Sequence, residues 1–463
     1  MPSAAVLISL LVPIIIGFAF VRACIPGEKH LCRHDWLRLC LGVGVGFGLC
    51  SCAFFVWLLV YGSVHVFYIS VELGLAIILG ALAVSRATGC RLCRSPMAPK
   101  TTLSRWTHPL VIVFVLIFLL ACMSFALESR IHPDGQGDAW AIWNLRARFL
   151  FRGGEQWRTS FSRILFWSHP DYPLLLPGLV ARSWIYTGAE TRNVPIGIAA
   201  LFTFATVGVL TTGLYALGDR EKALLAGIVL LGTSSFIKLG AAQYADVPIG
   251  FFFLTSILLL CMRDRLPVSG TILAGTSAAL AAWTKNEGLL FFVLLLIVMK
   301  CTKEPVSRFL SGAFCILALL TMFKLSLAPP DYLTQNTGTA LFQDVTDPSR
   351  YLTIAIGFIY EAINFGGQHL NPLLPLFAAL FLLKRKETRG ARSAAIILTG
   401  MCAGVFFIYL ITPVELSWQI AWSLARLLLQ LWPAALFTYA YVVDFPVASP
   451  AIIPETIPSS INQ

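Results

Sequence analysis

The sequence predicts an all-α polytopic membrane protein, a bundle of about thirteen transmembrane helices. Of its 463 residues, 57% are hydrophobic and only 12% are charged, and the mean hydropathy is +0.79. Apolar runs recur from end to end, each close to the roughly 20 residues that a helix needs to cross a hydrocarbon core of about 30 Å. Between these runs, no stretch is long enough to fold alone as a soluble domain.

The spans follow the apolar runs in order. They are predicted at 5–21, 40–61, 66–85, 109–127, 195–217, 223–241, 248–263, 269–284, 287–300, 308–327, 371–384, 392–412 and 418–443. Two further apolar stretches, 174–187 and 351–366, are interpreted as helices lying along the membrane interface. Counting either one as a span would invert the charge bias of every later loop.

Charge sets the orientation of the bundle. Short loops rich in Lys and Arg stay on the cytoplasmic side, and three such loops, 86–105, 300–308 and 384–392, share one side under this span list. The opposite, outer face then carries the N-terminus, the long loop 128–194, the turns at Asp246 and Lys285, and the loop 329–350. The first span is expected to be an anchor, since no basic segment precedes it.

The twelve cysteines agree with this orientation. None lies in the two long outer loops, so no structural disulfide is predicted there. Cys90 and Cys93 have the spacing of half a zinc site, but no second pair is close to them, and Cys32 with His34 is too distant in sequence. They are interpreted as cytosolic thiols.

The net charge of +11 belongs mostly to the cytoplasmic loops, where it sets topology and contacts anionic lipid. Nucleic-acid binding is therefore excluded. The outer loop 128–194 is different, because a long loop is largely exempt from the positive-inside rule and its arginines need another reason. These are Arg130, Arg146, Arg148, Arg152, Arg158, Arg163, Arg182 and Arg192.

Guanidinium groups bind phosphate in two-pronged geometry, so these arginines fit either a lipid-linked phosphate or general anchoring to headgroups. For Arg146 and Arg148, which follow Asp138 on the same predicted helix, substrate contact is the favoured interpretation. The loop also carries five tryptophans, including Trp140 and Trp143. Tryptophan is enriched at membrane interfaces whatever the function, so a stacking wall for a sugar and an aromatic belt both fit.

Carboxylates lie at the outer ends of several spans. Asp138 precedes a helical run and Asp246 enters the span from 248, so each could cap a helix. Lys285 and Glu287 form a charged turn between two apolar runs. Charges this close to hydrocarbon are costly and often mark function.

Four segments in order carry a resemblance. They are Gly137-Asp138-Ala139-Trp140, His169-Pro170-Asp171-Tyr172-Pro173-Leu174, Ala245-Asp246-Val247-Pro248 and Thr284-Lys285-Asn286-Glu287-Gly288. Together they resemble the C-type (GT-C) membrane glycosyltransferases, nearest to bacterial members of the dolichyl-phosphate-mannose protein mannosyltransferase-like group. The lipid A aminoarabinose transferase is a more distant relative. The resemblance covers about residues 109–300.

The resemblance implies an inverting enzyme that moves a sugar from a polyprenyl-phosphate-linked donor to a glycan, lipid or protein acceptor on the periplasmic face of the bacterial inner membrane. It implies Asp138 as the catalytic base and Asp246 as a second acid. The remaining residues that it places at the substrate are Arg146, Arg148, His169, Asp171, Tyr172, Lys285, Glu287, Trp140 and Trp143. The chain would divide into N-terminal helices (1–108), a GT-C-like core (109–327), C-terminal helices after an outer loop (328–443) and a tail (444–463).

Several alternatives stay open. The aminoarabinose transferase looks to have a lysine where this chain has His169, and histidine binds phosphate less securely near pH 7. No cofactor is called for, although a divalent metal held by His169, Asp171 and Asp138 is an alternative to the favoured metal-free site. The rival functions are a transporter or flippase of lipid-linked sugars, and an O-antigen polymerase or ligase. A transporter usually shows two similar halves and interrupted helices, which the sequence does not indicate.

Overall fold

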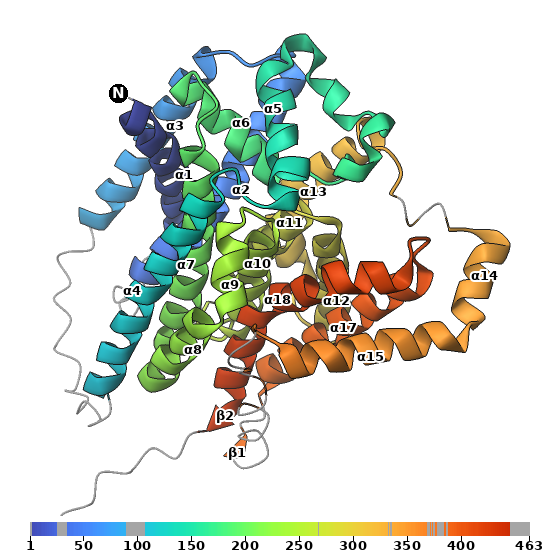
Figure 1. The fold of residues 1–463 in the computed structure, drawn as a ribbon. Helices are drawn as coiled ribbons and strands as arrows, with labels where there is room; N and C mark the ends of the chain where they lie inside the picture. The colour runs from blue at the N-terminus through green and yellow to red at the C-terminus, as the bar shows by residue number, and fades with distance from the viewer. Residues whose placement is uncertain are drawn as a thin grey trace, which may run out of the picture.

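A computed structural model gives the fold of the chain (Figure 1). It describes residues 2–25, 35–88, 107–266, 268–331, 333, 336–367, 371, 373, 376, 384–385 and 388–444. The cysteines at 32, 90 and 93, most of the predicted span 371–384 and nearly all of the tail 444–463 lie outside the described residues.

The regular secondary structure of the described residues is helical apart from one two-residue antiparallel pairing, β1 (Lys384–Arg385) with β2 (Val443–Asp444). The long helices are α1 (Pro2–Cys24), α2 (Asp35–Tyr61), α3 (Phe67–Thr88), α4 (Thr107–Ile131), α7 (Asn193–Ala216), α13 (Val306–Ser326), α17 (Arg389–Ile411) and α18 (Leu416–Val442). Shorter helices complete the bundle: α8 (Arg220–Gly232), α9 (Ser234–Ala241), α10 (Asp246–Cys261), α11 (Ser269–Ala282), α12 (Asn286–Cys301), α14 (Gly338–Thr346) and α15 (Pro348–Asn364).

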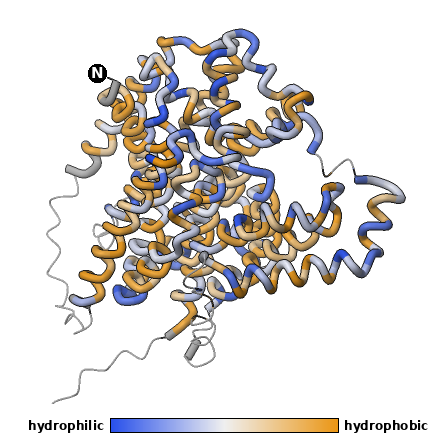
Figure 2. The backbone as a smooth tube through the Cα atoms, in the orientation of Figure 1, coloured by the Kyte–Doolittle hydropathy of each residue, from blue (hydrophilic) through white to orange (hydrophobic). Residues whose placement is uncertain are grey.

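The eight long helices are each long and apolar enough to cross a membrane, which fits a multi-pass membrane protein. Figure 2 shows hydrophobic residues along much of the bundle, with many hydrophilic ones in connecting segments. The predicted count of thirteen is not confirmed. Three predicted spans correspond to α10, α11 and α12, whose 14 to 16 residues extend only about 21–24 Å at the rise of an α-helix.

The predicted span 223–241 is also not one straight helix. It is α8 and α9, bent by 63° at their junction, and counting this pair as one span raises the number to nine. The break begins at Thr233, whose backbone is extended and whose hydroxyl accepts a hydrogen bond from Trp432 Nε1 of α18. The sequence showed no Pro there to signal the bend.

Small residues let the helices approach closely. In α11, a Cβ built on Gly275 would lie 1.9 Å from the carbonyl oxygen of Phe309 in α13. In α1, a Cβ on Gly17 would lie 1.9 Å from the carbonyl oxygen of Gly42 in α2. Glycine is therefore required at both crossings, as at many helix–helix contacts in membranes. The centre of the bundle is α10, which packs against α7, α11 and α18 and is buried along almost its whole length.

The long loop 128–194 forms a layer at one end of the bundle, the end that also carries the N-terminus (Figure 1). It contains a five-residue π-helix η2 (Ala139–Trp143), α5 (Asn144–Arg152), two 3₁₀ segments η3 (Gly154–Phe161) and η4 (Arg163–Ser168), and α6 (Leu175–Thr187).

The two stretches predicted as interfacial helices differ from each other. α6, the predicted 174–187, is enclosed by α1, α2 and α5, and its residues 175–185 are all buried. It therefore packs inside the protein, not along a surface. α15, the predicted 351–366, has one face packed on α17 and α18 through Ile354 and an opposite face of exposed apolar residues that includes Ile356 and Ile363.

A buried ion pair ties α6 to the N-terminal helices. Arg182 Nε donates to both carboxylate oxygens of Glu72 in α3, at 2.7 and 2.9 Å, and Arg182 Nη1 donates to the carbonyl oxygen of Ser9 in α1 at 2.6 Å. Tyr68 and Tyr186 also donate to Glu72. Glu72 is thus held inside the protein by Arg182.

Arg182→Met should destabilise the protein by about 3–5 kcal/mol, because it leaves the Glu72 carboxylate buried without its cation. The double variant Arg182→Met/Glu72→Leu should recover much of that loss. Arg192→Met is the matched control, because Arg192 pairs with Asp134 at the exposed surface and such pairs contribute about 0–1 kcal/mol. Unfolding in detergent micelles measures all three, and equal losses at positions 182 and 192 would contradict a special role for the buried pair.

Candidate functional site

The four segments that carry the resemblance converge at one place, together with a residue that the sequence analysis did not select, Arg426. This arginine lies in α18 and is the only charged residue between positions 416 and 442. Its Nη2 lies 2.5 Å from Asp138 Oδ2 and 2.9 Å from Asp246 Oδ2, and its Nε lies 3.1 Å from the same Asp246 oxygen. One guanidinium thus bridges the two predicted acids.

The two acids have different surroundings. The side chain of Asp246 is 1% exposed and also accepts hydrogen bonds from Gln430 Nε2 at 2.6 Å and Lys285 Nζ at 3.3 Å. Its lone pairs are thereby occupied. The side chain of Asp138 is 31% exposed, and among the described residues only Arg426 contacts its carboxylate. Neither acid caps its helix through the side chain, which corrects the capping alternative.

Lys285 stands between two carboxylates. Its Nζ lies 3.3 Å from Asp246 and 2.9 Å from Glu287, and all three side chains are largely buried. Burial lowers the pKa of the Lys285 ammonium, but the two neighbouring carboxylates outweigh it and raise the pKa above its usual value. Lys285 is therefore a fixed positive charge at neutral pH. Glu287 Oε2 is buried with no hydrogen-bond partner among the described residues.

Three stacked rings cover one side of this cluster. Trp143 stacks on Tyr172 with ring centroids 5.7 Å apart, and His169 stacks on the same ring at 4.7 Å. Lys285 Nζ lies 5.8 Å from the centre of the Tyr172 ring. Burial lowers the pKa of His169, and the carboxylate of Asp171 only partly opposes this, so the imidazole is neutral at pH 7. A neutral His169 is a poor contact for phosphate.

A second polar network fixes the other side of the loop. Asn286 Nδ2 donates to Asp171 at 2.6 Å and to Asp331 at 2.8 Å. Lys324 Nζ of α13 donates to the Asp171 carbonyl oxygen and to Asn286 Oδ1, each at 2.7 Å. Lys324 therefore links α12, α13 and the loop.

The two arginines predicted to contact substrate are engaged elsewhere. Arg146 is buried, and its guanidinium donates to the carbonyl oxygens of Tyr172 at 2.7 Å and Ser168 at 2.9 Å, and also to that of His169. Arg148 pairs with Glu190 at 3.2 Å. Arg146 is therefore a positioning residue for the His169–Tyr172 turn. The position of Arg146 in the sequence did not predict its apolar environment or its hydrogen bonds to three carbonyl oxygens.

Backbone geometry also marks this region. Among the described residues, His169 and Gln243 are two of the three non-glycine residues with positive φ, 47° and 62°. Gln243 is buried and accepts a hydrogen bond from Asn144 at 3.0 Å. Directly after Asp138, η2 is a π-helix, a conformation that is rare and frequent at functional sites. Strained backbone of this kind persists where the surroundings over-determine it, most often at sites of function.

The alternative metal site gains no support. His169 Nδ1 lies 4.0 Å from Asp171 Oδ1, and among the described residues no three His, Cys, Asp or Glu side chains are grouped so that they could hold a metal ion. Trp140, predicted as a stacking residue, is exposed next to Asp138, whereas Trp143 is buried in the ring stack.

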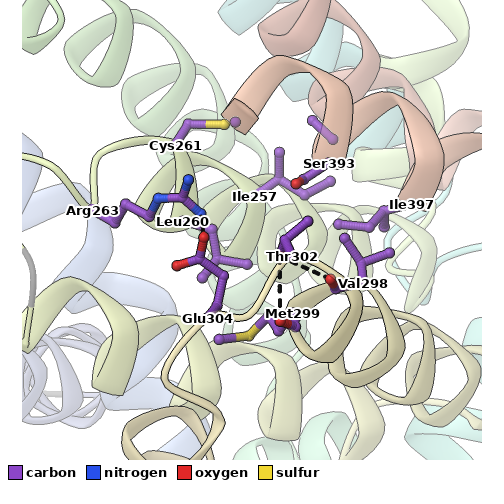
Figure 3. Close-up of a pocket in the computed structure, with 12 residues that line it drawn as sticks. Ile257, Leu260, Cys261, Arg263, Val298, Met299, Thr302, Glu304, Ser393 and Ile397 are labelled. Atoms are coloured by element: carbon purple, nitrogen blue, oxygen red, sulfur yellow. Dashed lines mark hydrogen bonds and ion pairs between the residues drawn. The ribbon is translucent and has the colours of Figure 1, made fainter. Parts of the chain in front are cut away.

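Two small pockets lie in the described structure. One borders the site and is lined by Trp143, Asn144, Leu176, Val180, Gln243, Tyr244 and neighbouring residues of α7 and α10. The other lies at the C-terminal ends of α10 and α12, beside the start of α17, where Arg263 pairs with Glu304 (Figure 3). This second pocket contains none of the predicted site residues.

Comparison of the chain with protein-family models, curated proteins and solved structures found no match. The chemistry of the site must therefore be argued from its own residues.

Arg146→Lys should loosen the turn from Ser168 to Tyr172, because an ammonium cannot reproduce a planar guanidinium that bonds several carbonyls at once. We expect a loss of about 1–3 kcal/mol, the range for hydrogen bonds to a charged group, and faster tryptic cleavage after Arg158 and Arg163. Arg148→Lys is the control, since its partly exposed pair with Glu190 tolerates lysine. Unchanged cleavage in the Arg146 variant would show that the turn is held by other contacts.

Proposed function

We propose that this protein is a membrane glycosyltransferase that uses a polyprenyl-phosphate-linked sugar as donor and works at the end of the bundle formed by the loop 128–194. The observation that carries the proposal is the Asp138–Arg426–Asp246–Lys285 cluster. It sets one accessible carboxylate beside two fixed cations at the end of a bundle of apolar helices. The resemblance of the four sequence segments supports the same activity.

The proposed chemistry needs one base and one positive site. An acceptor hydroxyl loses its proton to Asp138 as its oxygen attacks the anomeric carbon of the donor. The bond from that carbon to the phosphate oxygen breaks, and the lipid phosphate leaves with the electron pair. Attack opposite to the leaving phosphate gives inversion.

Asp138 suits the role of base because Arg426 engages one of its oxygens, Oδ2, while the other has no partner among the described residues. Asp246 does not suit it, because Gln430, Lys285 and Arg426 already surround its carboxylate. Its proposed role is to hold the two cations in place.

The cations Arg426 and Lys285 would stabilise the departing phosphate. Arg426 Nη1 makes no hydrogen bond within the described chain, so this nitrogen is the proposed donor to a phosphate oxygen. Arg426 of α18 thus replaces the predicted Arg146, Arg148 and His169 as a proposed phosphate contact. Trp140 is exposed and lies two residues after Asp138, and its stacking on a sugar ring stays a prediction.

A transporter or flippase of lipid-linked sugars remains the second candidate, and one observation favours it. The break between α8 and α9 is the kind of interrupted helix that lines substrate pathways in transporters. Transport would move the labelled lipid across the bilayer without making a new glycosidic bond.

The test uses the protein in vesicles supplied with a cell-envelope extract and a polyprenyl-phosphate-linked hexose labelled in the sugar. We expect covalent transfer of label, reduced by about two to four orders of magnitude in Asp138→Asn, which keeps the shape of the side chain but cannot accept the proton. Asp134→Asn is the control, because Asp134 is an exposed carboxylate of the same loop that pairs with Arg192.

Near-normal transfer by Asp138→Asn would remove Asp138 from the mechanism. Label that crosses the bilayer as intact donor, with no labelled acceptor, would favour the transporter. Mass spectrometry of envelope glycans and glycoproteins with and without the gene would then identify the sugar and the acceptor together.

A further inference from the structure

The segment η4 carries an exposed apolar tip next to the candidate site. The relative exposures of Ile164, Phe166 and Trp167 are 83%, 76% and 51%, and these residues lie within four positions of one another. The tip belongs to the outer loop, where such a concentration of large apolar side chains is costly in water. Something other than water is therefore expected to cover it.

The base of this segment is held firmly. Arg146 donates to the carbonyl oxygens of Ser168 and Tyr172, on either side of the strained His169. At the other end, Ser162 caps η4 by accepting a hydrogen bond from the backbone N–H of Ile164. The exposed tip thus belongs to a turn whose two ends are held in place by hydrogen bonds.

The position of the segment indicates its surroundings. Phe161, at the end of η3, packs on Phe323 of α13 with ring centroids 5.3 Å apart. Phe323 lies in the last turn of a helix long and apolar enough to cross a membrane. In Figure 1 the green-teal segment lies beside the upper end of α13. The last turn of a spanning helix meets the headgroup region, so η4 lies at that depth.

Charge agrees with this placement. Arg158 and Arg163 both precede the tip and are exposed, and among the described residues neither makes an ion pair, although the Arg158 guanidinium lies 5.5 Å from the centre of the Trp157 ring. Apolar side chains that enter the acyl region beside arginines that remain at the phosphates are the pattern of an interfacial membrane contact.

We propose that Ile164, Phe166 and Trp167 insert into the outer surface of the lipid bilayer, with Arg158 and Arg163 on anionic headgroups. The membrane contact predicted for 174–187 thus belongs to 164–167, since α6 is enclosed by protein. Because η4 leads directly into His169 and Tyr172, this insertion sets the ring stack at the depth of the lipid phosphates. The inference does not depend on the proposed activity.

The test measures depth. Phe166→Cys and Thr159→Cys are each labelled with an environment-sensitive fluorophore, in the full chain reconstituted in vesicles of equal parts phosphatidylcholine and phosphatidylglycerol. Thr159 is the control, because it is an exposed polar residue of the neighbouring η3. The signal of the identically labelled native chain is subtracted to remove its own cysteines. Quenching by a nitroxide on the lipid chain is compared with quenching by aqueous iodide.

We expect a blue-shifted emission at position 166 and a higher ratio of lipid to iodide quenching there than at position 159. An equal or lower ratio at position 166 would overturn the insertion. This readout requires no substrate, so a failure of the proposed glycosyltransferase activity would leave it unaffected. Conversely, a fully active protein with an iodide-accessible tip would overturn only the membrane contact.

Discussion

The arrangement of the site depends on the buried charge of Asp246. A carboxylate that is 1% exposed among apolar helices is tolerated only when cations and hydrogen-bond donors surround it. Arg426, Gln430 and Lys285 supply them, and this requirement draws α18 and the α11–α12 turn onto the start of α10. Arg426 then has a further donor to offer to Asp138. Buried Asp246 thus fixes the position of the accessible Asp138 through Arg426, which contacts both carboxylates.

Helix ends reinforce the same charges. Asp246 is the first residue of α10 and Glu287 is the second residue of α12, so both carboxylates lie at the positive ends of helix dipoles. Both carboxylates are largely buried, so the helix dipoles are weakly screened there.

The sequence predicted a helical membrane protein, and its four motifs identified the segments that meet at the candidate site. Both were predictable because hydrophobic runs and polar motifs are local signals. The sequence did not predict how Arg146, Arg182 and Lys324 are used, because each is satisfied by a partner distant in the chain, such as Glu72 for Arg182. Arg426 carried a usable signal, a lone charge within an apolar run, which is a mark of function in membrane helices. The break at Thr233 carried a weaker signal, because Gly232 and the serines after Thr233 mark it but no proline accompanies it.

The arginines of the outer loop divide into two groups once their partners are known. Arg146 binds carbonyl oxygens, and four others form ion pairs: Arg148 and Arg152 with Glu190, Arg182 with Glu72, and Arg192 with Asp134. These five arginines are engaged by partners within the protein, so the excess of arginine in this loop mainly secures its fold. The other three, Arg130, Arg158 and Arg163, are exposed and form no ion pair among the described residues. Arg158 and Arg163 precede the apolar tip, whereas Arg426 approaches the site from α18. In the two proposals, headgroup binding and donor recognition therefore fall to different residues, which the charge of the loop alone does not distinguish.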